Sequence, residues 1–114
     1  MQFLLLIYDN EVDFDKLPEK QIAEIMEEYR RFSAALKECG AHISSHRLRP
    51  VSSATCIRIR NGQTVLTDGP FAETKEQLGG YYLINVKDVD EATQWAAKVP
   101  SASFGSIEVR AVWE

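Results

Sequence analysis

A continuous apolar run near the start of the chain, Phe3 to Ile7, is the feature that most constrains the fold. Five consecutive apolar residues have the length of a strand but not its usual alternation, which is typical of a central strand buried on both faces. The run ends at Tyr8-Asp9-Asn10, a polar turn signal. We therefore expect this segment to be the central strand of a sheet.

The chain has 114 residues and a mass of 12.9 kDa, which predicts a single domain over residues 1–114. Surface scaling predicts roughly 6,300 Å² of accessible surface for the folded chain and about 18,700 Å² for the unfolded chain. About two-thirds of the surface is then buried on folding, which is enough to form a core without a metal or a disulfide. Apolar residues make up 45% and charged residues 26%, which excludes wholesale disorder. The net charge of −4 disfavours nucleic acid or an anionic membrane as a partner.

The targeting and cysteine patterns predict a cytoplasmic protein. The run Phe3–Tyr8 is too short to span a bilayer and lacks the flanks of a signal peptide. Cys39 and Cys56 have neither CxxC spacing nor the Cys/His spacing of a zinc site. We expect both to be reduced thiols, and we expect no cofactor and no metal.

Periodicity predicts two helices and one shorter helical segment. An apolar stripe at three- and four-residue steps runs through Pro18–Cys39, and Gly40 supplies its stop. An aspartate version of the capping box opens a second helix over 88–98. Residues 72–78 are expected to form a helical turn or two.

The strongest local signal is Asn61-Gly62, the favoured dipeptide of a type I′ hairpin, within 54–68. A two-residue loop makes Ile57 face Leu66, with Asp68 on the same side at the open end of the hairpin. Further strands are expected at 41–49, 81–86 and 106–113, the last alternating as far as Trp113.

This order of elements predicts an α+β fold, ferredoxin-like β-α-β-β-α-β with an inserted β-hairpin. Two helices would cover one face of the sheet, and the other face would then expose a large apolar patch. A homodimer that packs the two open sheet faces together removes that patch.

The segment Asp68 to Tyr82, DGPFAETKEQLGGYY, resembles the signature of the DGPF-type branch of the YCII-related proteins. The opening 3–8, the helix 90–97 and the ending 105–114 resemble that branch as well, so the resemblance covers the whole chain. It implies a bacterial dimeric α/β barrel of ferredoxin-like protomers. Most members are uncharacterised, and their genes often lie beside extracytoplasmic-function sigma factors.

The resemblance also implies a site. In the wider family a His–Asp pair is the proposed active site, with the Asp after the first strand and the His on the first helix. Asp9 carries over to this chain, whereas Tyr29 stands near the place of the histidine. An imidazole base would have to come from His42 or His46 on the next strand.

Three of the candidate residues each have a plainer alternative. Burial at the strand end can raise the pKa of Asp9 toward that of a base, or Asp9 is an exposed turn residue. Tyr29 donates a hydrogen bond into a pocket, or packs in the core. His46, expected in phase with His42 and Leu48, shuttles protons or lies on the surface, and two histidines alone do not hold a metal.

The turn after the hairpin supplies further candidates. Asp68 takes part in catalysis, or it closes the turn by accepting backbone N–H bonds, which would lower its pKa. Gly69 permits unusual dihedral angles, Pro70 adds rigidity and Phe71 forms a hydrophobic plug.

We expect a pocket between the sheet and its dimer mate, near Asp9, Tyr29 and Asp68. The pocket is expected to include Tyr8, Tyr81 and Tyr82, the last two on opposite faces of the sheet. The chemistry expected there is proton abstraction, or a lyase or isomerase step, on a small molecule. The alternative is a non-catalytic ligand-binding or regulatory dimer associated with a sigma factor, and a plainer one is a dimer without a ligand.

Overall fold

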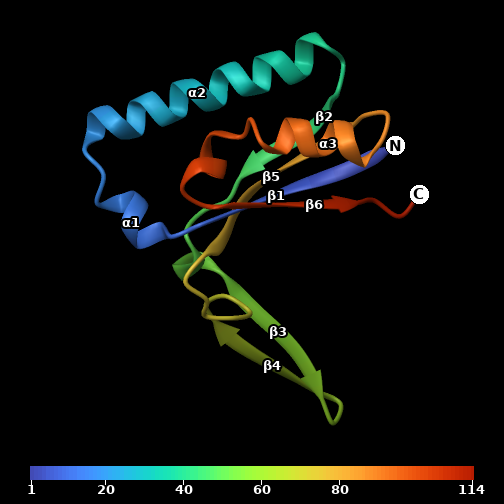
Figure 1. Cartoon of the computed structure of the whole chain (residues 1–114). Coiled ribbons are helices and arrows are strands. Elements are labelled where there is room, and N and C mark those ends of the chain that lie inside the picture. Colours follow the sequence, from blue (N-terminus) through green and yellow to red (C-terminus); the bar gives the residue numbers. More distant parts are fainter.

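The computed structural model describes residues 1–114 and shows a four-stranded sheet, three helices and a separate two-stranded hairpin (Figure 1). The strands are β1 (Gln2–Asp9), β2 (His42–Arg47), β3 (Thr55–Arg60), β4 (Gln63–Asp68), β5 (Gln77–Asn85) and β6 (Ser106–Ala111). The helices are α1 (Glu11–Asp15), α2 (Glu19–Glu38) and α3 (Val89–Ala96), with 3₁₀ turns η1 (Val51–Ser53) and η2 (Pro100–Ser103). The α+β class is confirmed.

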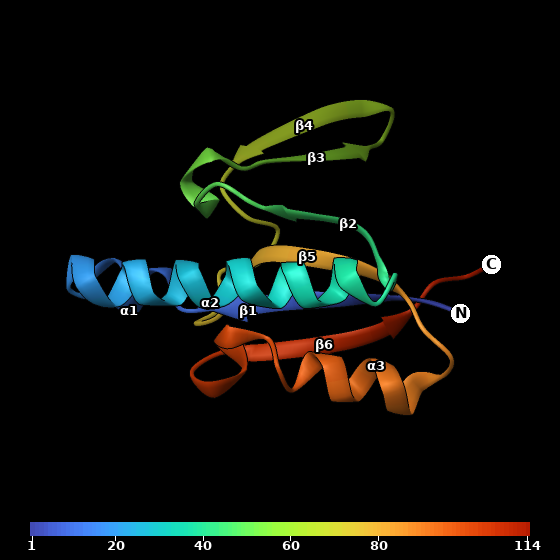
Figure 2. The same cartoon turned by 90° about the horizontal axis from the view of Figure 1, so that it is seen from above.

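Strand β1 lies inside the main sheet, whose order is β2-β5-β1-β6 with antiparallel neighbours throughout. Helices α2 and α3 cover one face of this sheet (Figure 2). Phe3, Leu5 and Ile7 are buried in the core formed with these helices, whereas Leu4 and Leu6 are only half-buried on the opposite face. The prediction of a central strand is confirmed, but within one chain only one of its faces is fully buried.

The two long helical predictions are confirmed. The predicted helix 18–39 corresponds to α2. None of the helices is both long and apolar enough to cross a membrane. Helix α3 begins at Asp88, whose carboxylate accepts the Glu91 N–H at 2.9 Å. The Glu91 carboxylate in turn accepts the Lys87 N–H at 2.8 Å, so side chains satisfy backbone donors at this end of the helix.

The predicted helical turn over 72–78 is wrong, because this segment has no helix and its end belongs to β5. The Gln77 side-chain amide donates to the carbonyl oxygens of Ala72 (2.9 Å) and Thr74 (3.0 Å), which holds the segment in an irregular turn. Strand β5 starts at Gln77 opposite Asp9, so it begins four residues before the predicted strand 81–86.

Helix α1 is an element that the sequence analysis missed. Asn10 was interpreted as part of a turn, but its side-chain oxygen accepts the N–H groups of Val12 (3.0 Å) and Asp13 (3.2 Å). This is an N-cap, and it starts a one-turn helix directly after β1. The chain therefore turns sharply at the residue that follows Asp9.

A bulge in β2 corrects the predicted phase of the two histidines. Ile43 is an extra residue, because His42 pairs with Ile84 and Ser44 pairs with Leu83. The register shift reverses which residues point to each face. The prediction that His42 and His46 alternate in phase is therefore wrong.

The hairpin forms in the predicted register, with Ile57 opposite Leu66 and positive φ angles at Asn61 and Gly62. We call β3, β4 and their loop, residues 55–68, the arm. The arm pairs with no other strand and projects from the β2 side of the sheet, away from the helices (Figures 1 and 2).

The arm makes the single chain less compact than predicted from its length. The radius of gyration is 16.0 Å, against roughly 13 Å for a compact domain of this size. The accessible surface is 8052 Å² rather than the roughly 6,300 Å² predicted from the mass. The predicted strand 106–113 also ends earlier, at Ala111, and Trp113 beyond it is fully exposed.

Two glycines offer a matched test of the packing around the end of β1. A Cβ added at Gly105 would collide with the Tyr8 carbonyl oxygen, whereas one at Gly79 would lie 3.5 Å from Asp9 Oδ1, an ordinary contact. We expect Gly105→Ala to lower the free energy of unfolding by about 2 kcal/mol, and Gly79→Ala by less than about 1 kcal/mol. Urea unfolding measures both, and equal stability of the two variants would contradict this packing.

Candidate functional site

A cavity of about 530 Å³ opens at the end of the sheet where β1 finishes. Its lining comes from the ends of β1, β2 and β5, from α1 and α2, and from η2. The volume lies within the range of roughly 300–1,000 Å³ typical of small-molecule sites. One chain forms this cavity, whereas the sequence analysis expected a pocket between the sheet and a second copy.

The cavity brings together five of the predicted site residues, and the others lie outside it. Those that line it are Asp9, Tyr29, His46, Tyr81 and Tyr82. They come from four separate elements, β1, α2, β2 and β5.

Asp9 is the last residue of β1 and lies half-buried in the cavity wall. Gly79 is an extra residue of β5 between the pairs Ile7–Gly80 and Tyr8–Leu78, and it lies directly beside the Asp9 carboxylate. Burial raises the pKa of Asp9, the negative charge of Glu11 raises it further, and Arg47 opposes both. No hydrogen bond within the chain contributes to this balance.

The two carboxylates that raise the pKa of Asp9 are themselves engaged. Glu11 accepts the Val51 N–H at 3.1 and 3.3 Å, which ties α1 to the segment that follows β2. Glu76 accepts the hydroxyl of Ser106 at 2.7 Å. Asp9 is therefore the carboxylate of this group that remains available to a ligand.

Tyr29 and Ser101 form a short hydroxyl pair in the cavity wall, with 2.5 Å between their oxygen atoms. Ser101 is only 2% exposed. Burial raises the pKa of Tyr29 to about 12, so its hydroxyl stays protonated at neutral pH. Tyr29 also packs against the core. Core packing and hydrogen bonding, which were alternatives for this residue in the sequence, therefore both occur. The sequence pattern around Ser101 gave no signal of this contact.

The two tyrosines of β5 point to opposite faces, as predicted. Tyr82 is buried in the core, and its ring meets that of His42 with centroids 6.3 Å apart. Tyr81 lies beside His46, with centroids 5.8 Å apart. The strand register thus places the His46 imidazole on the face of the sheet opposite to the helices.

Two arginines at the end of β2 line the cavity and were not among the predicted site residues. Arg47 and Arg49 are exposed, and neither forms an ion pair with a carboxylate. The Arg47 guanidinium carbon lies 5.6 Å from the centroid of the Phe14 ring, which also lines the cavity. Two basic residues at the end of the predicted strand 41–49 were the available sequence signal.

Asp68 and the turn after it lie at the base of the arm, outside this cavity. The Asp68 carboxylate is exposed and accepts no backbone N–H, so the predicted turn-closing bond is absent. The turn is held instead by the Gly69 N–H, which donates to the Ala54 carbonyl at 2.7 Å. Gly69 has a φ of 103°, which confirms its predicted unusual dihedral angles.

Three further predicted residues also lie outside the cavity. Phe71 is 82% exposed, so it plugs no pocket within one chain. Pro70 lies next to it in the same turn, half-buried. Tyr8 lies one residue before Asp9, and its hydroxyl is 3.5 Å from the Glu108 carboxylate.

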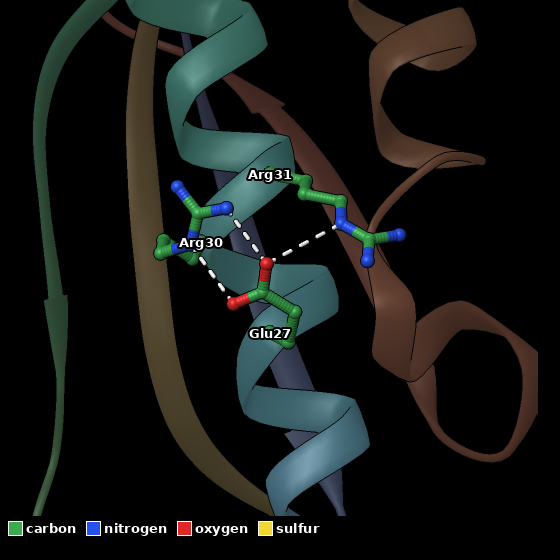
Figure 3. Close-up of polar contacts among 3 residues, drawn as sticks. All are labelled: Glu27, Arg30 and Arg31. Atoms are coloured by element: carbon green, nitrogen blue, oxygen red, sulfur yellow. Dashed lines mark hydrogen bonds and ion pairs between the residues drawn. The ribbon is translucent and has the colours of Figure 1, made fainter.

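A cluster of charges on α2 is a surface feature rather than a site (Figure 3). Glu27 accepts from Arg30 at 2.7 and 2.9 Å and lies 3.5 Å from Arg31. The hydrogen bond from Arg30 lowers the pKa of Glu27 to about 2. All three side chains are open to solvent, where ion pairs contribute little to stability.

The chain contains no group of three His, Cys, Asp or Glu side chains that could hold a metal ion. Cys39 and Cys56 are both free thiols. The polar side chains of the cavity carry carboxylate, hydroxyl, imidazole and guanidinium groups.

The pairing of Tyr29 with Ser101 can be tested by a double-mutant cycle. Tyr29→Phe leaves the buried Ser101 hydroxyl without a partner, which costs about 1–3 kcal/mol. The combined variant with Ser101→Ala removes both hydroxyls, so we expect it to be less destabilised than the sum of the single changes. Urea unfolding of the four proteins measures this coupling, and purely additive losses would contradict the pair.

The balance at Asp9 predicts an effect of pH on stability. The folded chain holds the Asp9 proton more tightly than the unfolded chain, so stability falls as pH rises from the unfolded-state pKa through the folded-state pKa. Asp9→Asn removes this cost. Because solvent still reaches the carboxylate, we expect a gain of a fraction of a kcal/mol at pH 7, roughly 1–4 °C in Tm.

Thermal unfolding from pH 3 to pH 7 measures this effect. The stabilisation by Asp9→Asn is expected to disappear toward pH 3, where the carboxylate is protonated in both states. Asp13→Asn, an exposed carboxylate of α1, is the control. A loss of stability in Asp9→Asn at pH 7 would contradict the raised pKa.

Comparison with known proteins places the chain in a family. The YCII-related domain matches residues 1–114. An uncharacterised protein of Rhizobium meliloti (strain 1021) is 36% identical over 112 residues, which cover 96% of this chain and 90% of that protein. The chain therefore belongs to the YCII-related domain family.

Proposed function

We propose that the cavity binds a small organic molecule and that Asp9 exchanges a proton with it. The observation that supports this proposal best is the Asp9 carboxylate, which lines the cavity, has a raised pKa and receives no hydrogen bond from the chain. A carboxylate in this condition is a stronger base than an exposed one and is free to contact a ligand.

The arginines at the cavity favour a ligand that carries a negative charge. Arg47 and Arg49 have no carboxylate partner within the chain, and a guanidinium binds carboxylates through paired N–H groups. We propose a small carboxylic acid whose anionic end meets these arginines. The aromatic ring of Phe14 beneath Arg47 offers an apolar surface to the rest of the molecule.

The proposed reaction starts with removal of a proton from carbon next to a carbonyl group. Asp9 takes the proton, and the electron pair of the C–H bond moves into the carbonyl to form an enolate. With the Ser101 hydroxyl donating to its oxygen, the Tyr29 hydroxyl, protonated at neutral pH, donates a hydrogen bond to the enolate oxygen. Return of the proton to another carbon completes an isomerase step, and loss of a leaving group completes a lyase step.

The remaining expectations belong to the same proposal. The sheet order and the inserted hairpin support a ferredoxin-like protomer, and the half-buried Leu4 and Leu6 support a homodimer through the open sheet face. Membership of the DGPF-type branch and a cytoplasmic location stay predictions from sequence, as does the sigma-factor association. A non-catalytic ligand-binding dimer would use the same cavity, so the test must separate binding from chemistry.

The proposal can be tested with a panel of small 2-oxo and 3-oxo carboxylic acids and their uncharged amides. In D₂O, proton NMR detects loss of the C–H signal next to the carbonyl, and ligand-observed NMR detects binding. We expect the wild type to bind an acid and exchange its proton, Asp9→Asn to exchange at least about 100-fold more slowly, and Arg47→Gln to bind at least about tenfold more weakly.

Arg31→Gln, a change on the exposed surface of α2, is the control and should match the wild type. Exchange should rise with pH through the pKa of Asp9 and then level off, because the base must be ionised. Binding without exchange supports the non-catalytic dimer. Equal exchange by the wild type and Asp9→Asn would refute a role for Asp9.

A further inference from the structure

The more apolar face of the arm is the face that is more exposed to solvent. Ile57, Ile59 and Leu66 share one face and are 66%, 66% and 65% exposed. On the opposite face Cys56 and Arg58 are partly covered, and Val65 is 43% exposed. A surface strand normally turns its apolar side inward, so the single chain leaves the arm without its packing partner.

The arm also lacks the support that a two-stranded hairpin needs. Two strands alone are marginally stable in water, and further strands or a packed surface are required for stability. The arm pairs with no strand of the main sheet. The whole chain exposes roughly 1,700 Å² more than a compact protein of its mass. This excess is about twice the area that each partner of a standard protein interface buries.

We infer that the apolar face of the arm, formed by Ile57, Ile59 and Leu66, packs on a second copy of this chain. The arm projects on the side of the sheet away from α2 and α3, where the open sheet face also lies (Figure 1). A copy that docks on the open face therefore comes to lie beside the arm. The inference rests on the homodimer proposed above and does not depend on chemistry in the cavity.

A two-fold axis makes this contact reciprocal. In a symmetric dimer each chain uses the same surface, so the arm of each copy contacts the other copy. The assembly is then complete with two chains and leaves no binding surface for a third. Both unpartnered apolar surfaces are then covered in one assembly, the half-buried leucines of the sheet face and the exposed side chains of the arm. An anionic membrane is a poor alternative partner for these apolar surfaces, because the chain has a net charge of −4.

The direct test is a mixed-label NMR experiment on the wild-type protein. Chains with ¹³C-labelled Ile and Leu methyl groups are mixed with unlabelled chains, and a filtered NOE spectrum records contacts between copies only. We expect such contacts from the methyl groups of Ile57, Ile59 and Leu66. Their absence in a dimeric sample would overturn the inference, because the arm would then pack elsewhere.

Two neighbouring cross-strand pairs supply matched variants for the second test. Ile57 lies opposite Leu66 on the exposed apolar face, and Arg58 lies opposite Val65 on the other face. We expect I57T/L66T to weaken dimerisation at least about tenfold in sedimentation equilibrium, and R58T/V65T to change it less than about threefold. Threonine keeps the strand preference at all four positions. Equal effects of the two variants would contradict a docked apolar face.

The outcomes separate the arm from the dimer and from the cavity. A wild type that stays monomeric at millimolar concentration overturns both the homodimer and the docked arm. A dimer whose arm methyl groups contact only their own chain overturns the arm alone. Both results leave the exchange assay at Asp9 unaffected, since one chain lines the cavity. If I57T/L66T fails to fold, the NOE measurement on the wild type still decides.

Discussion

The pairing of β1 with a strand on each edge holds both the core and the candidate site in place. Its alternate residues Phe3, Leu5 and Ile7 are buried beneath the helices, and the same alternation continues to Asp9. Side chains on a doubly paired strand move little, because displacement would break hydrogen bonds on both sides. Asp9 pairs with β5 alone, but it directly follows these doubly paired residues, which positions its carboxylate as proton transfer requires of a base.

The polar groups near the site differ in whether they already have a hydrogen-bond partner within the chain. Glu11 and Glu76 accept hydrogen bonds from their own surroundings, and Tyr29 is paired with Ser101. Asp9 and Arg47 remain without a partner of this kind. An unengaged carboxylate base and an unengaged guanidinium cation in one cavity are complementary to a molecule that carries both a weakly acidic hydrogen and an anionic group.

Local patterns account for the parts of this fold that the sequence predicts well. The hairpin register follows from Asn61-Gly62, and α2 follows from a single apolar stripe, since both depend on neighbours in sequence. The segment 72–78 contains residues suited to a helix, but pairing with β1 recruits its end into β5. Such pairing is a tertiary effect that local preference does not contain.

The same distinction between local and tertiary effects separates the site residues that the sequence identified from those that it did not. Asp9 and Tyr29 were identified from the end of a strand and from a family resemblance, and both line the cavity. Asp68 was identified from a conspicuous motif, but no spacing shows that the arm carries it away from the sheet. Ser101 has no distinguishing pattern and takes part only because η2 returns to α2.

The extra residue in β2 has a consequence for the recognition of ligands. Beyond Ile43 the strand continues in opposite phase, and Arg47 consequently pairs with Gly80 and lies over Phe14 on the side of α1. In an unbroken strand Arg47 would point to the opposite face. The placement of the Arg47 guanidinium thus depends on Ile43, the inserted residue four positions away. Removal of Ile43 would turn Arg47 to the opposite face of the sheet, although Ile43 itself does not line the cavity.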